Sequence, residues 1–203
     1  MIDKLMYLYG PKCTAVNVNG EFNDVINVPC KQMTLCEAVN CSFKLPLRIH
    51  EGNLSCIGAR RSMGFFHDID KHVQTIAGNN NMPERFVRKA LQNIPVLENI
   101  RHINLGIQEY SEHEDFVDLY ILYVSPAMVT QILYRLAQEG LRAHISPFFF
   151  LSVCGNVLAN TYSRQVTSIS FGCPDSRVCG GIESHEVVVG IPNKVAKRLV
   201  AKL

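Results

Sequence analysis

Two segments in the second half of the chain each pass from a buried strand, through a proline, into an amphipathic helix. In the first, the apolar run DLYILYV at 118–124 precedes Ser125 and Pro126, which supply an N-cap and a first-turn proline for the helix AMVTQILYRLAQEG. In the second, a strand at 186–190 leads to Pro192 and a terminal helix. Strands that alternate with helices predict an α/β or α+β fold, with a mixed β-sheet and flanking helices. The two strand–proline–helix units fit an internal pseudo-repeat, but this is also a common way to begin a helix after a strand.

The rest of the chain contains weaker signals for regular structure. Alternation over residues 13–22 with Asn19-Gly20 predicts a hairpin, and apolar spacing over residues 29–43 predicts a helix. Ser55 is the expected N-cap of the next helix, and Pro83 opens another. A loop at 78–83 and strands in KLPLRIH, HINLGIQEY and VTSISFG complete the expected elements.

The length and net charge of the chain limit the classes of protein to which it can belong. The 203 residues fit one domain over 1–203, with a smaller N-terminal lobe over 1–77 as the alternative. A net charge of +2, without a run of five basic residues, favours no nucleic-acid partner. No apolar run reaches the ~18 residues that span a bilayer, and MIDKLMYLYG lacks the pattern of a secretory signal. We therefore expect a cytoplasmic protein without membrane contact, and a homodimer on general frequency.

The eight cysteines are the residues that most suggest chemistry. In a reducing cytoplasm, cysteines in this number favour metal or redox work over disulfides. No CxxC pair occurs, and the closest pairs are Cys36 with Cys41 and Cys173 with Cys179. On a helix over 29–43, Cys36 and Cys41 point roughly 140° apart, so they would not bind one ion together. Any single cysteine is also readily explained as a small buried hydrophobic residue.

Three cysteines have neighbours that favour a site. In SFGCPDSRVCGG, glycine and proline surround Cys173, and backbone N–H groups there can reach a thiolate or a cluster sulfide. Cys154 lies in a similar small-residue setting, expected just after an apolar strand. Cys56 lies near an expected helix N-terminus beside Arg60 and Arg61, which predicts a lowered thiol pKa.

Charged residues supply further candidates. Arg60 and Arg61, with help from Arg164 and Arg177, could bind phosphate or carboxylate, although surface arginines are the simpler explanation. FHDIDKH offers four candidate ligands for a hard metal, His67, Asp68, Asp70 and His72, but it also fits a solvated helix face. Two further candidates, each with a simpler structural explanation, are His113 in a charged turn and Glu186 at the edge of the last strand.

Four blocks, in order, carry a resemblance to a known family. CEAVNCSF, NLSCIGARRSMGF, VCGNVLANTYSRQVTSISFGCPDSR and HEVVVGIP resemble the signature blocks of the uncharacterised family called domain of unknown function 169. That family has archaeal and bacterial members, many of them anaerobes, and no agreed activity. One departure is Ile57, where the family pattern usually has proline.

The resemblance singles out Cys36, Cys56, Cys154 and Cys173 as the matching cysteines. Four cysteines spread along a chain fit one site assembled by the fold, and such a site suits an iron–sulfur cluster better than a local zinc knuckle. The leading hypothesis is therefore a cysteine-ligated iron–sulfur protein in electron transfer, sensing or anaerobic metabolism.

Two alternatives remain open at this point. One is a thiol-dependent enzyme in which Cys56 is the nucleophile and Arg60 and Arg61 hold an anionic small molecule. The other is a ligand-binding or assembly module without chemistry.

Overall fold

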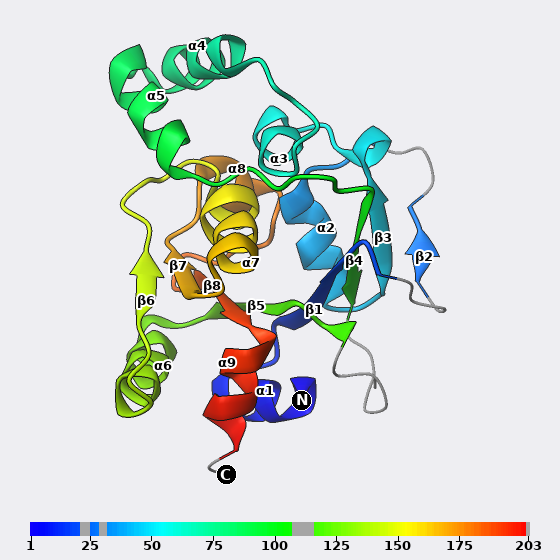
Figure 1. The fold of residues 1–203 in the computed structure, drawn as a ribbon, viewed down its shortest axis with the longest axis vertical. Coiled ribbons are helices and arrows are strands. Elements are labelled where there is room, and N and C mark those ends of the chain that lie inside the picture. Colours follow the sequence, from blue (N-terminus) through cyan, green and yellow to red (C-terminus); the bar gives the residue numbers. More distant parts are fainter. Residues whose placement is uncertain (21–24, 29–31, 107–115, 202–203) are drawn as a thin grey trace.

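The fold, taken from a computed structural model, is a mixed eight-stranded sheet with helices on both faces (Figure 1). The structure describes residues 1–20, 25–28, 32–106 and 116–201. The strand order is β2-β3-β4-β1-β5-β8-β7-β6, and only β2–β3 and β6–β7 are parallel pairs among the described strands. The strands are β1 (Cys13–Val18), β2 (Ile26–Asn27), β3 (Leu47–His50), β4 (His102–Gly106), β5 (Leu119–Val124), β6 (Ala143–Ile145), β7 (Thr167–Ser170) and β8 (Val187–Pro192).

Helices cover the sheet in two groups. The helices are α1 (Ile2–Tyr9), α2 (Leu35–Ser42), η1 (Glu51–Asn53), α3 (Ile57–Ser62), α4 (Ile69–Asn80), α5 (Glu84–Asn93), α6 (Pro126–Gln138), the π-helix η3 (Ser152–Ala159), α7 (Asn160–Arg164), α8 (Pro174–Val178) and α9 (Asn193–Val200). In Figure 1, α1, α6 and α9 lie at the lower side of the view, whereas α3, α4, α5 and α8 lie at the upper side.

The two faces of the sheet carry two separate cores, here called the thiol face and the terminal face. On β5, Leu119, Ile121 and Tyr123 pack into the thiol face together with α2, α3, α4, α5 and η3. The alternate residues Tyr120 and Leu122 pack against α1, α6 and α9 on the terminal face. Because successive strand side chains point to opposite faces, a strand buried on both sides reads as a continuous apolar run.

The predicted mixed sheet with flanking helices is confirmed, and so are both strand–proline–helix units. The Ser125 hydroxyl caps α6 by accepting the Met128 N–H at 3.3 Å, with Pro126 in the first turn. Pro192 immediately precedes α9. Strands β3, β4, β5 and β7 fall within the segments predicted for them, whereas β8 continues to Pro192, beyond the predicted range 186–190. β4 lies between β3 and β1, so strands from residues 1–77 and from later residues alternate within one sheet.

Three local predictions are wrong. β1 forms no hairpin with the next segment; instead it lies between β4 and β5, and the Asn19 side chain accepts the Arg101 N–H at 2.7 Å. The N-cap of α3 is Cys56 rather than Ser55. Cys154 does not follow a strand but lies within η3. An apolar run buried on every side has no period that separates strand from helix, which explains the last error.

Two helix boundaries differ from the predictions. The helix expected over 29–43 begins at Leu35, after the Thr34–Glu37 capping box, although residues 29–31 lie outside the described part. The loop expected at 78–83 is shorter, because α4 continues to Asn80 and ends at Asn81, whose φ is 50°.

Candidate functional site

Four cysteines from four separate segments lie at the starts of helices on the thiol face. Cys56 and Cys173 are the N-caps of α3 and α8. Cys36 and Cys154 lie in the first turns of α2 and η3. Backbone N–H groups in the first turn of a helix have no partner within the helix, so sulfur atoms placed there meet hydrogen-bond donors.

Close backbone packing brings these helix starts together. α2 packs against α8 and η3, and α3 also packs against η3. A Cβ atom added at Gly180 would lie 2.8 Å from the Cys36 Cβ, and one at Gly58 would lie 3.2 Å from the Cγ of Leu151, which precedes η3. Glycine at these two positions therefore lets the segments that carry the cysteines approach one another.

Cys36 and Cys173 form a coupled pair. A hydrogen bond with Cys36 is the largest influence on Cys173, and it lowers the pKa of Cys173 to about 6. The same hydrogen bond, followed by burial, raises the pKa of Cys36 well above its usual value. Cys36 is thus the thiol donor, and Cys173 is the thiolate acceptor.

Cys56 and Cys154 belong to the same electrostatic group. Burial raises the pKa of Cys154, and the charges of Cys56 and Cys173 raise it further. Burial also raises the pKa of Cys56, with smaller contributions from Asp175 and Cys173. The sequence predicted a lowered pKa at Cys56, so that direction is wrong: burial outweighs the hydrogen bonds from the Ala59 and Gly58 N–H groups at the helix start.

Hydrogen-bond donors surround the sulfur atoms. The backbone N–H groups of Ser152 and Ser176 lower the pKa of Cys173, after the larger effect of Cys36. Those of Gly58 and Ala59 act in the same direction on Cys56, although Cys56 forms no complete capping hydrogen bond. The Ser62 side chain and the Gly155 N–H do so for Cys154. Such donors stabilise a thiolate, whether it is free or bound to a metal.

The four thiols are near one another without forming a finished ligand set. Within the described residues, no group of three or more His, Cys, Asp or Glu side chains makes a ready-made metal site. Cys41 and Cys179 are exposed, as expected for residues that point away from the cluster, and Cys13 is buried in the other core. Cys30 lies outside the described residues.

Arg60 and Arg61 point to different environments. Arg60 is partly exposed and pairs with Glu51 at 2.9 Å. Arg61 is buried and donates one hydrogen bond to the Leu91 carbonyl at 3.2 Å, while its Nη1 has no partner in the described part of the chain. Burial lowers the pKa of Arg61, and Cys154 acts in the opposite direction. Arg61 is therefore electrostatically coupled to the cysteine cluster.

The other charged candidates do not gather around the cysteines. Arg164 donates to the Asn93 carbonyl at 2.8 Å. In FHDIDKH, Asp68 caps α4, Asp70 pairs with Arg88 at 2.6 Å, and burial lowers the pKa of His72 to about 4. His67 is exposed, and His113 lies outside the described residues.

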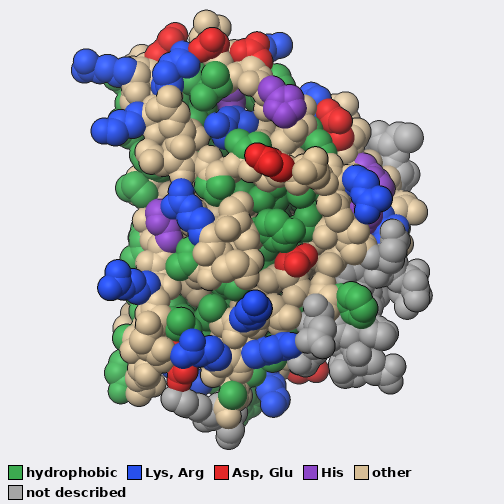
Figure 2. Space-filling view, viewed as in Figure 1, with side chains coloured by type: hydrophobic (Ala, Val, Ile, Leu, Met, Phe, Trp, Pro, Cys, Tyr) green, Lys and Arg blue, Asp and Glu red, His purple; other side chains and the backbone are tan. Residues whose placement is uncertain are grey.

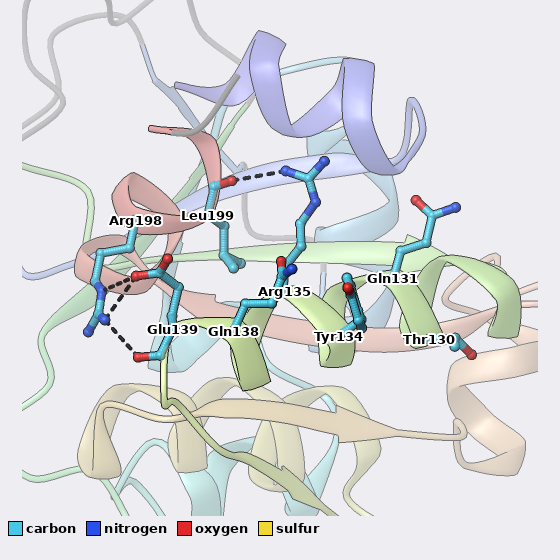
Figure 3. Close-up of a pocket in the computed structure, with 8 residues that line it drawn as sticks. All are labelled: Thr130, Gln131, Tyr134, Arg135, Gln138, Glu139, Arg198 and Leu199. Carbon is cyan, nitrogen blue, oxygen red and sulfur yellow. Dashed lines mark hydrogen bonds and ion pairs between the residues drawn. The ribbon is translucent and has the colours of Figure 1, made fainter.

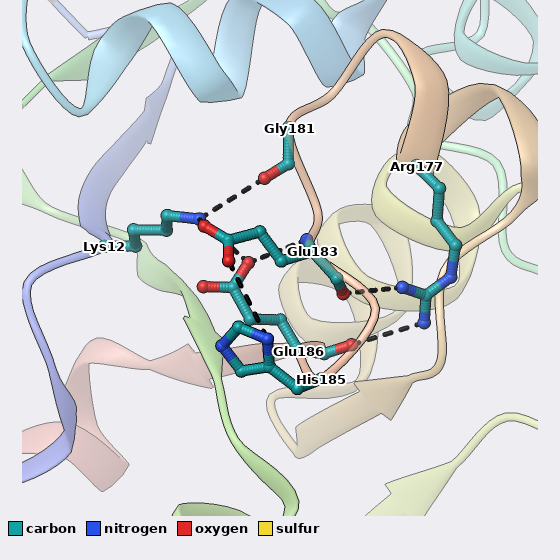
Figure 4. Close-up of polar contacts among 6 residues, drawn as sticks. All are labelled: Lys12, Arg177, Gly181, Glu183, His185 and Glu186. Carbon is teal, nitrogen blue, oxygen red and sulfur yellow. Dashed lines mark hydrogen bonds and ion pairs between the residues drawn. The ribbon is translucent and has the colours of Figure 1, made fainter.

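The sequence reasoning missed the partly buried ion pairs that Lys12 forms with Glu183 and Glu186. Lys12 donates to Glu186 and Glu183, each at 2.9 Å (Figure 4). Arg177 holds the same segment by donating to the carbonyls of Phe171, Glu183 and Glu186. Glu186 was considered as a site residue, but no local pattern connects it with Lys12, which is 174 residues away.

A separate cavity lies away from the cysteines. It has a volume of about 550 Å³, and α6 and α9 supply its lining (Figure 3).

Lysine and arginine side chains are spread over several elements of the face shown in Figure 2. Among the described helices, none is both long enough and apolar enough to cross a membrane.

The lowered pKa of Cys173 has a measurable consequence in metal-free protein. We expect its alkylation by iodoacetamide to accelerate about tenfold per pH unit below pH 6, and to level off above it. Burial raises the pKa of Cys56, so less of it is thiolate at pH 7 and it should react more slowly. Peptide mass spectrometry would give each rate, and equal rates at Cys173 and Cys56 would contradict the assigned pair.

The fold and the cluster define an α/β protein with four electrostatically coupled cysteines on one face of its sheet. Three of them are buried, and Cys56 is half-buried. The chain belongs to the family domain of unknown function 169, described as "Uncharacterised ArCR", whose model matches residues 10–202. It is also 26% identical, over 154 residues, to the uncharacterised protein MJ0308 of Methanocaldococcus jannaschii. That match covers 71% of this chain and 64% of the relative. No solved structure matches the chain.

Proposed function

We propose that this protein holds a metal centre through Cys36, Cys56, Cys154 and Cys173, and that this centre is an iron–sulfur cluster. One observation carries the proposal: four sulfurs from distant segments share a buried region in which they shift one another's pKa. Buried thiols that repel one another's charge gain stability when a cation replaces their protons.

The donor set favours a cluster over zinc in a small knuckle. All four ligands would be thiolates, each from a different segment, and N–H groups already point at several sulfurs. Since the thiols do not form a finished ligand set, binding would require them to turn about their Cα–Cβ bonds. When bound, a cluster would supply one-electron chemistry, which fits electron transfer or sensing in a reducing cytoplasm.

The two arginines receive different roles in this proposal. Arg61 is buried and coupled to Cys154, so it would offset part of the negative charge of the thiolates. Arg60 reaches the surface and would meet an anionic small molecule from solvent.

Metal and sulfide analysis of protein purified without oxygen tests the proposal. Iron together with acid-labile sulfide, and a broad absorption band near ~400 nm, is the expected result. Zinc in equal molar amount without sulfide would keep the ligand set but reject the cluster. Protein free of any metal, also after reconstitution with iron and sulfide, would reject the site.

A second candidate function is a thiol-dependent enzyme, and a specific observation shifts its nucleophile. The pKa of Cys173 is lowered to about 6, whereas that of Cys56 is raised, so Cys173 is the better nucleophile. This candidate requires a metal-free protein in which Cys173 is alkylated fastest among the four clustered cysteines.

A further inference from the structure

A second cavity lies between the end of α5, β6, η3 and α7, and none of the four clustered cysteines lines it. Its volume is about 230 Å³. Most ligand pockets have volumes of roughly 300–1,000 Å³, so this cavity fits only a small molecule. Its lining combines apolar side chains with a few polar ones, which is typical of a small-molecule site.

Two buried asparagine side chains line this cavity. Asn156 is 3% exposed, and its Nδ2 donates to the Phe150 carbonyl at 2.7 Å. Asn160 is 2% exposed, and its Nδ2 donates to the Ser168 hydroxyl at 2.8 Å. The Oδ1 oxygen of each has no partner in the described part of the chain, and neither oxygen is fully enclosed. Because a buried amide oxygen without a hydrogen bond is unfavourable, these two acceptors indicate a ligand that donates hydrogen bonds.

Arg164 on α7 brings a positive charge to the same cavity. The side chain is exposed, and its Nη2 donates to the Asn93 carbonyl at 2.8 Å, which holds the guanidinium in place. His144 on β6 also lines the cavity, and burial followed by the charge of Arg164 lowers its pKa, so its ring is neutral at pH 7. No acidic side chain is present among the described residues of the lining. The guanidinium is therefore available for an anion from solution.

An aromatic ring supplies part of the apolar wall. Phe148 stacks on Phe150 at a centroid distance of 5.7 Å and meets Phe86 edge to face at 6.0 Å. These contacts hold the ring in place, and such a wall accommodates the carbon skeleton of a ligand. Asn156 lies in the π-helix η3, and π-helical segments are frequent at functional sites.

We propose that this cavity binds a small hydroxycarboxylate, whose carboxylate pairs with Arg164 and whose hydroxyl group donates to the Oδ1 of Asn156 or Asn160. A carboxylate accepts charge-assisted hydrogen bonds from a guanidinium, and one guanidinium suits a single negative charge. A hydroxyl suits the amide oxygens better than an ammonium group, because a buried ammonium would have no acidic partner in the lining. This site goes beyond the proposed metal centre and does not depend on it.

Isothermal titration calorimetry with named acids tests this site. Lactate, glycerate and 3-hydroxybutyrate are the probes, and propionate and butyrate are the matched acids without a hydroxyl. We expect at least one hydroxy acid to bind with a dissociation constant below about 10 mM. The matched acid should bind roughly tenfold more weakly, since an asparagine oxygen then stays unpaired. If no hydroxy acid binds in this range, or if propionate and butyrate bind as tightly, the proposal is overturned.

Arg164→Gln removes the positive charge, and it should weaken binding of the hydroxy acid by about tenfold or more. Arg142→Gln is the matched control, because Arg142 is exposed, immediately precedes β6 and does not line the cavity. That control should bind as tightly as the wild type. Equal affinities of the two variants would overturn the proposal. Iron and sulfide content bears only on the metal centre, so the two proposals can fail separately.

Discussion

Cys154→Ser is expected to abolish most metal binding, as are the corresponding serine variants of Cys36, Cys56 and Cys173. Removing a hydrogen-bond partner of a metal ligand already weakens binding about 10–100-fold, and removing the ligand itself should weaken it at least as much. Cys154 is the strongest single case, because it is buried inside η3 and no neighbouring cysteine of its own segment can replace it. Iron and sulfide per protein chain, measured after anaerobic reconstitution, give the result.

Two cysteines of the same chain are matched controls. Cys41 shares α2 with Cys36, and Cys179 immediately follows α8, whose N-cap is Cys173; both are exposed. Serine at either position should leave iron and sulfide content unchanged. Unfolding curves of the metal-free variants separate loss of a ligand from loss of the fold. If Cys154→Ser retains as much metal as Cys179→Ser, the four-cysteine site is wrong.

Gly180→Ala is expected to damage both the fold and the site. The added Cβ would lie 2.5 Å from the Ser176 carbonyl oxygen and 2.8 Å from the Cys36 Cβ. Neither neighbour is the end of a flexible side chain, so α8 and α2 would have to move apart. Overpacking of this kind lowers the free energy of unfolding by roughly 1–3 kcal/mol. Because Cys36 and Cys173 lie on the two separated elements, metal content should fall as well.

Gly78→Ala provides the comparison for Gly180→Ala. A Cβ at Gly78, within α4, would meet no atom within 4 Å. Alanine there should raise the free energy of unfolding by roughly 0.5–1 kcal/mol, since glycine is unfavourable inside a helix. Denaturant titration of both variants measures the two effects. Equal stability of the two variants would contradict the close packing of α8 on α2.

Much of the second half could be predicted because its signals are local. The cap at Ser125 and the proline at 126 act within one turn of α6, so they work in any tertiary context. The first half was predicted less well. The Asn19-Gly20 pair is a turn signal, yet β1 pairs with β4 and β5 instead of with the next segment. Partner choice in a sheet depends on the whole fold and leaves no mark in a short stretch.

The candidate site, like the fold, could be predicted from the sequence only in part. The residues around Cys173, Cys154 and Cys56 made these three cysteines candidates, and the family resemblance grouped them with Cys36. Only the tertiary structure decided that burial raises the pKa of Cys56, because a pKa depends on surroundings that come from other segments.

Local chemistry in the sequence thus determined the helix starts, the apolar strands and the residue types at the cysteine cluster. The tertiary structure alone decided which thiols act on one another and that Arg61 is coupled to Cys154. Helix caps and apolar runs act over a few residues, whereas burial and charge coupling act through space between segments that the sequence separates widely.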